Sequence, residues 1–325
     1  MNAIIVHGGK NYCNYIDDCV EQFFLFNKNS KLFCIADQNF SELQILSQKF
    51  SNFQVILSSS LKKSAAHRFY LAFNRSAYNT WRGGFWRFVV ERFFLIEEFM
   101  QQTAEKNLLH FEYDNLIFEN INNFEAIFSK QNKILLPADG DKRCIAGVIF
   151  IPTYKHLNSF CKFYNKHCTI RIKNDMFAFS DFIDKMPFIC GTLPVVPSTY
   201  TNGKIEFVSK KGEIHKKIER FSNNFKDFGV IFDAAAYGQF IGGIDGRNTS
   251  ENADLSDQNG ETEKNETCGF VNPDAAYNVE DFSFEWKCEN GLKIPFLNYK
   301  GESYKIFNLH IHSKKLNLYK SNREN

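Results

Sequence analysis

The stretch Leu108-Leu-His-Phe-Glu-Tyr-Asp-Asn-Leu-Ile-Phe118 decides how the rest of the chain is interpreted. Two leucines, followed by aromatic and other apolar residues, predict that it begins as a buried strand. Alternate side chains of an extended chain share a face, which groups His110, Glu112 and Asp114. Burying carboxylates is costly unless a cation neutralises them, and Mg²⁺ or Mn²⁺ suits carboxylate oxygens. The stretch predicts a metal site, with acids that meet solvent at a strand end as the simpler alternative.

The residues before this stretch alternate between predicted strands and helices. Buried strands are predicted at 3–6, 31–36 and 53–57, and helices at 15–26 and 41–48. This βαβ pattern is typical of nucleotide-binding sheets, whose ligands bind beyond the carboxyl ends of the strands. His7, Gly8 and Asp37 stand at those ends and are candidate nucleotide contacts. No G-x-G-x-x-G fingerprint or P-loop is present, and an ordinary turn is the alternative for Gly8.

A long helix is predicted from Phe85 to about residue 102. Apolar residues recur there at intervals of three and four, and Arg92 lies on the same apolar face. A buried arginine needs a carboxylate or phosphate partner. Arg92 is therefore a candidate substrate contact, and a structural salt bridge to Glu112 or Asp114 is an equal alternative.

The second half of the chain continues the alternation. Strands are predicted at 133–137 and 144–151, helices at 122–130, 156–167 and 175–186, and an extended segment at 193–198. The acids Asp175, Asp181 and Asp184 are interpreted as helix caps or solvated positions. Residues 233–245 predict a short helix with Asp233 as its N-cap, and the polar residues 249–267 predict a mobile surface loop.

The last strong pattern is Tyr304-Lys-Ile-Phe-Asn-Leu-His-Ile-His-Ser-Lys-Lys-Leu316. Alternation in a strand places Asn308, His310 and His312 on one face. Two imidazoles followed by two lysines suit a metal and a phosphate group respectively. A solvent-facing polar strand near the C-terminus is the alternative.

Composition limits the class of protein. The chain has 325 residues, enough for one large α/β domain or two smaller ones, and a net charge of +2 does not favour nucleic acid as a partner. Nine cysteines without metal-binding spacing predict reduced thiols and a cytoplasmic protein. No apolar run is long enough for a transmembrane helix. Phe-rich helices and a basic C-terminal tail allow weak membrane-surface association, with ordinary solvation of the tail as the simpler interpretation. The basic residues of this tail are Lys314, Lys315, Lys320 and Arg323.

Three features together resemble nucleotide-sugar glycosyltransferases of the GT-A fold. The helix ending Arg92-Phe-Phe-Leu-Ile-Glu-Glu-Phe-Met100 leads into Glu112-Tyr-Asp114, where that family has its Asp-x-Asp motif. Residues 146–152, Ala-Gly-Val-Ile-Phe-Ile-Pro, resemble the family's next strand, and the terminal His-x-His-Ser-Lys is the third feature. The resemblance covers residues 1–155 and 300–316. It implies a single large α/β domain with a Rossmann-type, mostly parallel central sheet and helices on both faces.

The resemblance also implies a division of labour between the halves. Residues 1–155 are expected to bind the sugar nucleotide, and residues 156–325 to form the acceptor side, with the C-terminal strand closing the metal site. Asp114 is the expected metal ligand, with Glu112 as second or ribose-side acid and His312 completing the shell. The remaining assignments are diphosphate contacts at Lys314 or Lys315 and catalytic acceptor-side acids at Asp233 and Asp245.

The function expected from the resemblance is transfer of a sugar from a nucleoside-diphosphate sugar to a glycan or other hydroxyl acceptor. Mn²⁺ or Mg²⁺ is the expected cofactor, a UDP-sugar the first donor to test, and polysaccharide biosynthesis the expected setting. An inverting enzyme would need a carboxylate base, for which Asp233 or Asp245 is available. A nucleotidyltransferase, with His7-Gly-Gly-Lys10 as a faint phosphate loop, and a non-catalytic carbohydrate-binding protein are the alternatives.

Overall fold

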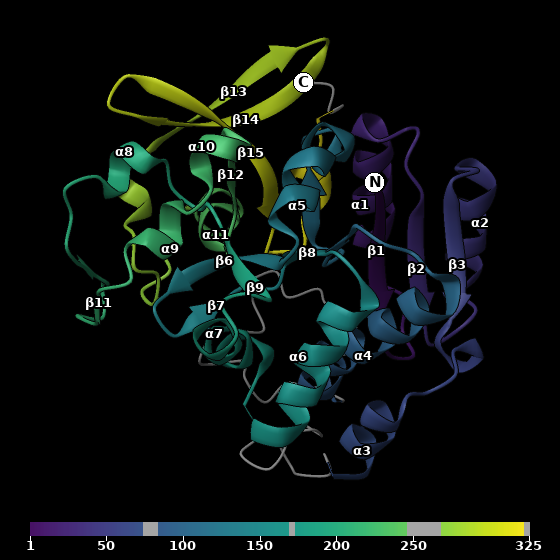
Figure 1. Cartoon of the computed structure of the whole chain (residues 1–325). Coiled ribbons are helices and arrows are strands. Elements are labelled where there is room, and N and C mark those ends of the chain that lie inside the picture. Colours follow the sequence, from purple (N-terminus) through teal and green to yellow (C-terminus); the bar gives the residue numbers. More distant parts are fainter. Residues whose placement is uncertain (74–83, 169–172, 246–267, 322–325) are drawn as a thin grey trace.

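A computed structural model describes residues 1–73, 84–168, 173–245 and 268–321 of the chain (Figure 1). The predicted surface loop at 249–267 lies outside these residues, as does Arg323 of the basic tail. None of the helices in the described ranges is long and apolar enough to cross a membrane.

The architecture is mixed α/β, built on a mostly parallel central sheet. The strand order is β3-β2-β1-β4-β8-β6-β7, and β9 also pairs with β6. The strands are β1 Asn2–His7, β2 Leu32–Ala36, β3 Phe53–Leu57, β4 Leu108–Phe111, β6 Ile134–Gly140, β7 Arg143–Cys144, β8 Val148–Ile151 and β9 Cys190–Leu193. The pairs β1–β2, β2–β3, β1–β4 and β6–β9 are parallel, whereas β8 runs antiparallel to both β4 and β6. The predicted fold class is confirmed.

Helices cover both faces of this sheet, because successive strand residues point to opposite sides. In β1, Ala3 and Ile5 join a core with α1 (Tyr15–Phe26) and α2 (Ser41–Lys49). Ile4 joins a second core with α3 (Ala65–Phe73), α4 (Phe85–Thr103), α6 (Tyr154–His167) and α7 (Asp175–Lys185). Figure 1 shows these four helices grouped below the sheet. Strands with two apolar faces thus read as continuous apolar runs.

A second sheet lies against the first core. Its order is β12-β15-β14-β13, with β5 also pairing with β15. The strands are β5 Asn115–Ile117, β12 Val230–Phe232, β13 Ser283–Glu289, β14 Leu292–Tyr299 and β15 Glu302–His310. The chain therefore leaves the central sheet at Phe111 and enters the second sheet at Asn115. The predicted strand start is present, but the extended chain assumed through Asp114 ends at Phe111, because residues 112–114 turn between the two sheets.

The long helix α4 begins at the predicted residue and ends at Thr103. Its predicted single apolar face is wrong, since all residues from Val90 to Met100 are buried. Phe85, expected on the buried face, is 44% exposed. The reason is that α4 packs among β1, α3 and α6, so that most of its circumference is covered.

The remaining elements differ from the predictions at their ends. The strand predicted at 144–151 is two strands, because residues 145–147 separate β7 from β8. The short helix α11 runs from Ala236 to Gly242, so Asp233 lies before the N-cap position, but its side chain accepts from the first-turn amides of Tyr237 and Gly238 as a cap does. The shorter α-helices and strands are α5 Glu125–Gln131, α8 Ser198–Thr201, β10 Phe207–Val208, β11 Ile214–His215, α9 Glu219–Ser222 and α10 Phe225–Phe228. Short 3-10 helices are described at Ser58–Ser60, Ile121–Phe124, Val279–Asp281 and Leu316–Leu318.

Candidate active site

The turn between the two sheets presents two carboxylates. The Glu112 amide donates to the Gly147 carbonyl at 2.9 Å, and the Asn115 amide donates to the Glu112 carbonyl at 2.9 Å. The Ile311 amide, just beyond β15, donates to the Asp114 carbonyl at 2.9 Å. The backbone of the acidic turn is thus held by one strand connection from each sheet.

The C-terminal strand brings an imidazole to these carboxylates. His310 Nε2 lies 3.0 Å from Asp114 Oδ2 and 3.6 Å from Glu112 Oε2. One ligand atom from each of Glu112, Asp114 and His310 falls within 4.8 Å of the others, and among the described residues this is the group found with metal-ligand spacing. Two oxygens and one imidazole nitrogen form a donor set that Mn²⁺ accepts.

Two glycines make room for His310. A Cβ on Gly147 would lie 2.8 Å from His310 Nδ1, and a Cβ on Gly238 would lie 2.0 Å from the His310 carbonyl oxygen. Real Cβ atoms do not approach this closely, so a side chain at Gly147 would displace the imidazole, and one at Gly238 would displace the backbone of His310. Gly147 lies in the Ala-Gly-Val segment, and its role here is the close approach of the ring.

Asp233 fixes the same strand from behind. Its Oδ2 accepts from the amides of His310 and Gly238 at 2.9 and 2.8 Å, and its Oδ1 accepts from the Tyr237 amide at 2.9 Å. The residue is fully buried. A carboxylate with three backbone donors and no exposed surface is placed to hold β15 against α11, and the role of Asp233 as a catalytic base stays a prediction.

Two cations lie against the carboxylates. Lys314 forms an ion pair with Asp114, and Arg92 forms one with Glu112. Arg92 Nη2 also donates to Asp175 Oδ2 at 2.9 Å. Of the two roles left open for Arg92, the salt bridge to Glu112 is therefore present, and it places the guanidinium beside the predicted metal ligands.

These contacts shift the pKa values of the site. Burial alone would raise the pKa of Asp114, but His310 and Lys314 outweigh it and hold that pKa well below its usual range. Burial alone would lower the pKa of His310, but Asp114 and Glu112 raise it. Burial raises the pKa of Asp175 to about 6, with Arg92 opposing the change. Asp114 is thus held as a carboxylate at neutral pH.

The carboxyl ends of β1 and β2 lie beside the acidic turn. The Gly9 amide donates to Asp37 Oδ2 at 2.9 Å, and Ser58 Oγ donates to Asp37 Oδ1 at 2.6 Å. A Cβ on Gly8 would lie 2.7 Å from Phe88 Cδ1, so the loop after β1 rests on α4. Asp37 thus orders this loop through the Gly9 amide.

His7 is packed among aromatic rings. Its ring centroid lies 5.1 Å from that of Phe40, 5.2 Å from that of Tyr113 and 6.0 Å from that of Tyr12. Burial lowers the pKa of His7, so the imidazole is neutral at neutral pH. Tyr113 belongs to the acidic turn and joins this aromatic group to the carboxylates.

His312 and Asp245, predicted as ligand and base, lie next to the site. The Asp245 amide donates to His312 Nδ1 at 3.1 Å, and the rings of His310 and His312 are 6.2 Å apart. Burial, together with Lys314 and His310, lowers the pKa of His312 to about 3. Lys315 is exposed. Among the described residues, His310 rather than His312 contacts the carboxylates of Glu112 and Asp114. Because β15 ends at His310, the alternation that would place both histidines on one face does not extend to His312.

His110 lies apart from the carboxylates with which it was grouped. Its Nδ1 lies 3.0 Å from the Ile4 carbonyl oxygen inside the central sheet. Burial, with Arg92 nearby, lowers its pKa to about 3. The grouping was wrong because the chain is not extended past Phe111.

Sequence reasoning missed Asp175 as a site residue. It was interpreted as a helix cap, but the cap of α7 is Asn174, whose Oδ1 accepts from the Phe177 amide. The available signal was the pair Asn174-Asp175 at the helix start, where one of the two residues suffices as a cap.

Comparisons with known proteins give similar structures only. A scan against protein-family models finds no match, and a search of curated proteins finds none that is significant. The glycosyltransferase GlyE of Streptococcus pneumoniae matches 59% of this chain and 45% of its own at 14% identity and TM-score 0.39. Mouse xyloside xylosyltransferase 1 matches 62% of this chain and 89% of its own at 9% identity and TM-score 0.39.

A cytidylyltransferase from Leptospira borgpetersenii matches 59% of this chain and 75% of its own at 7% identity and TM-score 0.35. The match to GlyE covers less than half of the GlyE chain. At these identities and TM-scores, what the chain does must be inferred from its own site.

Proposed function

We propose that this protein is a metal-dependent glycosyltransferase that moves a sugar from a nucleoside-diphosphate sugar, a UDP-sugar first, to a glycan or other hydroxyl acceptor. The observation that carries the proposal is the group of Glu112, Asp114 and His310, whose ligand atoms lie within 4.8 Å of one another. The group lies beside the carboxyl ends of β1 and β4, the edge at which parallel sheets bind ligands.

The three ligands would hold Mn²⁺ or Mg²⁺, with His310 in the role that the resemblance implied for His312. The bound cation would stabilise negative charge on the departing diphosphate. Asp114 is the central ligand in this proposal, because its low pKa keeps it ionised. Lys314 rests on Asp114 and would move to a phosphate oxygen when the donor binds, and Lys315 follows it in the chain.

The nucleoside would bind at the loop after β1. Asp37 holds that loop through Gly9 and supplies a carboxylate at the end of β2. His7 packs on Tyr12 and Phe40, and it contacts the acidic turn through Tyr113. Stacking of an aromatic ring on a base does not depend on the hydrogen-bond donors and acceptors of that base. These rings would therefore contribute to affinity more than to selection of one base.

Arg92 and Asp175 would face the transferred sugar. Their ion pair is buried, and Glu112 shares the guanidinium. A sugar hydroxyl that meets such a pair can accept from Arg92 and donate to Asp175. Asp245, at the end of the described segment, remains the proposed base for the acceptor hydroxyl in an inverting reaction.

Thermal shift with UDP, GDP and CDP, each with and without Mn²⁺, tests the proposal. We expect one nucleoside diphosphate to raise the melting temperature in a Mn²⁺-dependent way, since a ligand that binds only the folded state stabilises it. A donor screen by mass spectrometry over common sugar nucleotides then identifies the sugar. No response to any nucleotide together with binding to glycans would favour a carbohydrate-binding protein, and product from a nucleoside triphosphate and a sugar phosphate would favour a nucleotidyltransferase.

A further inference from the structure

The second sheet ends in a strand with an open edge. All seven residues of β13 pair with β14, from Ser283 opposite Asn298 to Glu289 opposite Leu292. No strand within the described ranges pairs with the other side of β13. Figure 1 shows β13 at the outer margin of the molecule, beyond β14. An edge strand of this length presents unpaired amides and carbonyls that template pairing with another chain.

The side chains of β13 form a self-complementary pattern. Glu285 and Lys287 share one face of the strand, and Trp286 between them lies on the other face and is 37% exposed. The Glu285 and Lys287 side chains are 52% and 35% exposed and 3.4 Å apart. We propose that β13 pairs antiparallel with β13 of a second copy of this chain, about a two-fold axis at Trp286, so that the second sheets of the two copies become continuous.

The register follows from the charges. With the two-fold axis at Trp286, Glu285 lies opposite Lys287 of the second copy, and Lys287 lies opposite Glu285 of the second copy. An axis at Lys287 instead places lysine opposite lysine and Glu285 opposite Glu289. An axis at Glu285 places glutamate opposite glutamate. Opposite charges that face each other across a strand pair stabilise it and like charges destabilise it, so the axis at Trp286 is favoured over these two. An axis at Cys288 would also place Lys287 opposite Glu289, but only residues 287–289 of β13 would then pair, whereas the axis at Trp286 pairs all seven residues of the strand.

The rest of the hairpin is compatible with this pairing. Phe284 packs on Tyr237 and Phe240, with ring centroids 5.7 and 5.5 Å apart, and Trp286 packs edge-on to Phe118 at 5.8 Å. The hairpin is therefore fixed to the body of the protein by one face, and no other strand of the described residues covers the edge of β13. A two-fold interface uses the same patch on both copies, and here the patch is complementary to itself.

Charge reversal tests the register. Glu285→Lys places lysine opposite lysine across the axis, and Lys287→Glu places glutamate opposite glutamate. We expect the wild type to be a dimer in sedimentation velocity and each single variant to associate at least about tenfold more weakly. An equimolar mixture of the two variants restores complementarity and should form a heterodimer, and the double variant Glu285→Lys/Lys287→Glu should dimerise like the wild type.

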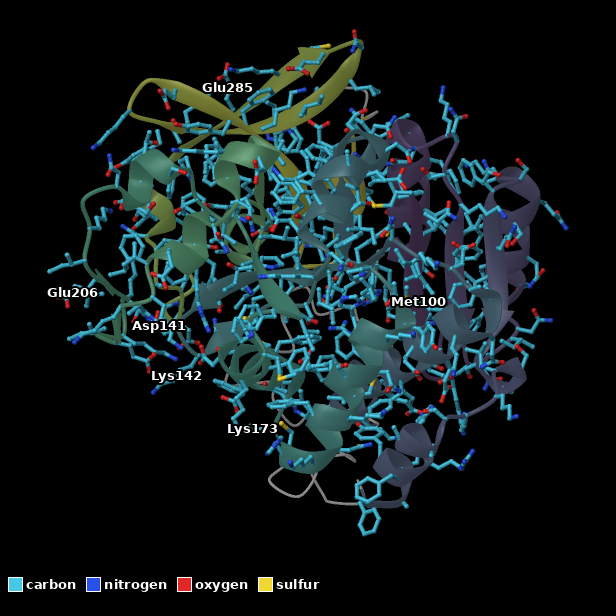
Figure 2. The ribbon with its side chains drawn as sticks, viewed as in Figure 1. Met100, Asp141, Lys142, Lys173, Glu206 and Glu285 are labelled. Atoms are coloured by element: carbon cyan, nitrogen blue, oxygen red, sulfur yellow. The ribbon has the colours of Figure 1, made fainter. Side chains whose placement is uncertain are left out.

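Glu206→Lys and Lys142→Glu are the matched controls, because both side chains are exposed and lie away from Glu285 (Figure 2). They should leave the mass unchanged, and circular dichroism checks that all variants fold. A monomeric wild type would overturn the proposal. A dimer that survives both single reversals would also overturn it, as would a failure of the mixed variants to associate.

Discussion

The position of the His310 imidazole depends on the absence of a side chain at Gly147. His310 reaches the carboxylates because Gly147 leaves room for its ring, and the Cβ of an alanine there would lie 2.8 Å from Nδ1. Since displacement of a site residue by about 1 Å can cost roughly 100-fold in rate, we expect Gly147→Ala to lose activity on that scale. Gly191→Ala is the control, as its Cβ meets two side-chain ends, Leu135 Cδ2 at 3.3 Å and Lys133 Cδ at 3.9 Å, and no backbone atom within that range. Equal activity of the two variants would contradict the role of Gly147.

Asp114 is the carboxylate that contacts both His310 and Lys314 in the proposed metal site. Its carboxylate pairs with both His310 and Lys314, and the substitution Asp114→Asn keeps its shape while removing that charge. We expect Mn²⁺-dependent nucleotide stabilisation to disappear and transfer to fall at least about 100-fold, because a ligand and a counter-charge are lost together. Asp227→Asn, an exposed carboxylate on α10, is the control. A folded Asp114→Asn protein that still transfers sugar would remove the metal assignment.

At the scale of elements, α3 is tied to α4 by a buried histidine. His67 Nδ1 lies 2.9 Å from Glu98 Oε1, and its Nε2 lies 3.2 Å from Glu91 Oε1. Burial alone would lower the pKa of His67, but the two carboxylates raise it above its ordinary value of 6.5. The pKa of Glu91 is lowered, because His67 and Arg87 outweigh its burial. His67 and the two glutamates therefore form a charged contact between α3 and α4 in the folded protein.

The sign of the pH dependence follows from these directions. The contribution of His67 is complete below pH 6.5 and is lost as the pH rises through the higher folded-state pKa. The contribution of Glu91 is lost only in acid, below 4.5. The difference in unfolding free energy between wild type and His67→Gln should thus be largest near about pH 5.5 and smaller at about pH 8.5.

Urea unfolding of both proteins across that range measures this difference. His156→Gln is the control, because burial lowers the pKa of His156 and its contribution cannot grow as the pH falls. If the difference in unfolding free energy between wild type and His67→Gln does not change with pH, the contact between His67 and the two glutamates is not an ion pair.

At the scale of the molecule, one buried asparagine ties three strands of the second sheet together, since Asn308 lies in β15, Asn115 in β5 and Asp233 directly after β12. Asn308 Nδ2 donates to Asn115 Oδ1 at 2.8 Å, and Asn308 Oδ1 accepts from the Asp233 amide at 3.1 Å. The halves of the chain also interlock, since β9 enters the central sheet while β5 enters the second. We therefore expect one cooperative unfolding transition for the whole described body.

Removing this connection should weaken the whole molecule. Asn308 is fully buried, so Asn308→Ala leaves the Asp233 amide without its acceptor and should lower the unfolding free energy by about 2–3 kcal/mol. Donor binding should weaken as well, because Asn115 follows Asp114 and His310 follows Asn308 by two residues. Chemical denaturation and nucleotide titration measure the two effects. A second transition at lower denaturant would contradict the single cooperative unit.

The sequence by itself determined the alternation of strands and helices, because buried parallel strands need runs such as residues 3–6 and 31–36 and amphipathic helices need their own spacing. It also determined which acids and imidazoles were candidates. Only the tertiary structure decided that the chain turns at residues 112–114, that His310 rather than His312 faces Asp114, and that Asp175 reaches Arg92. Alternation along a strand gives a residue's face but not where the strand ends, and contacts between residues nearly 200 positions apart depend on how two sheets pack.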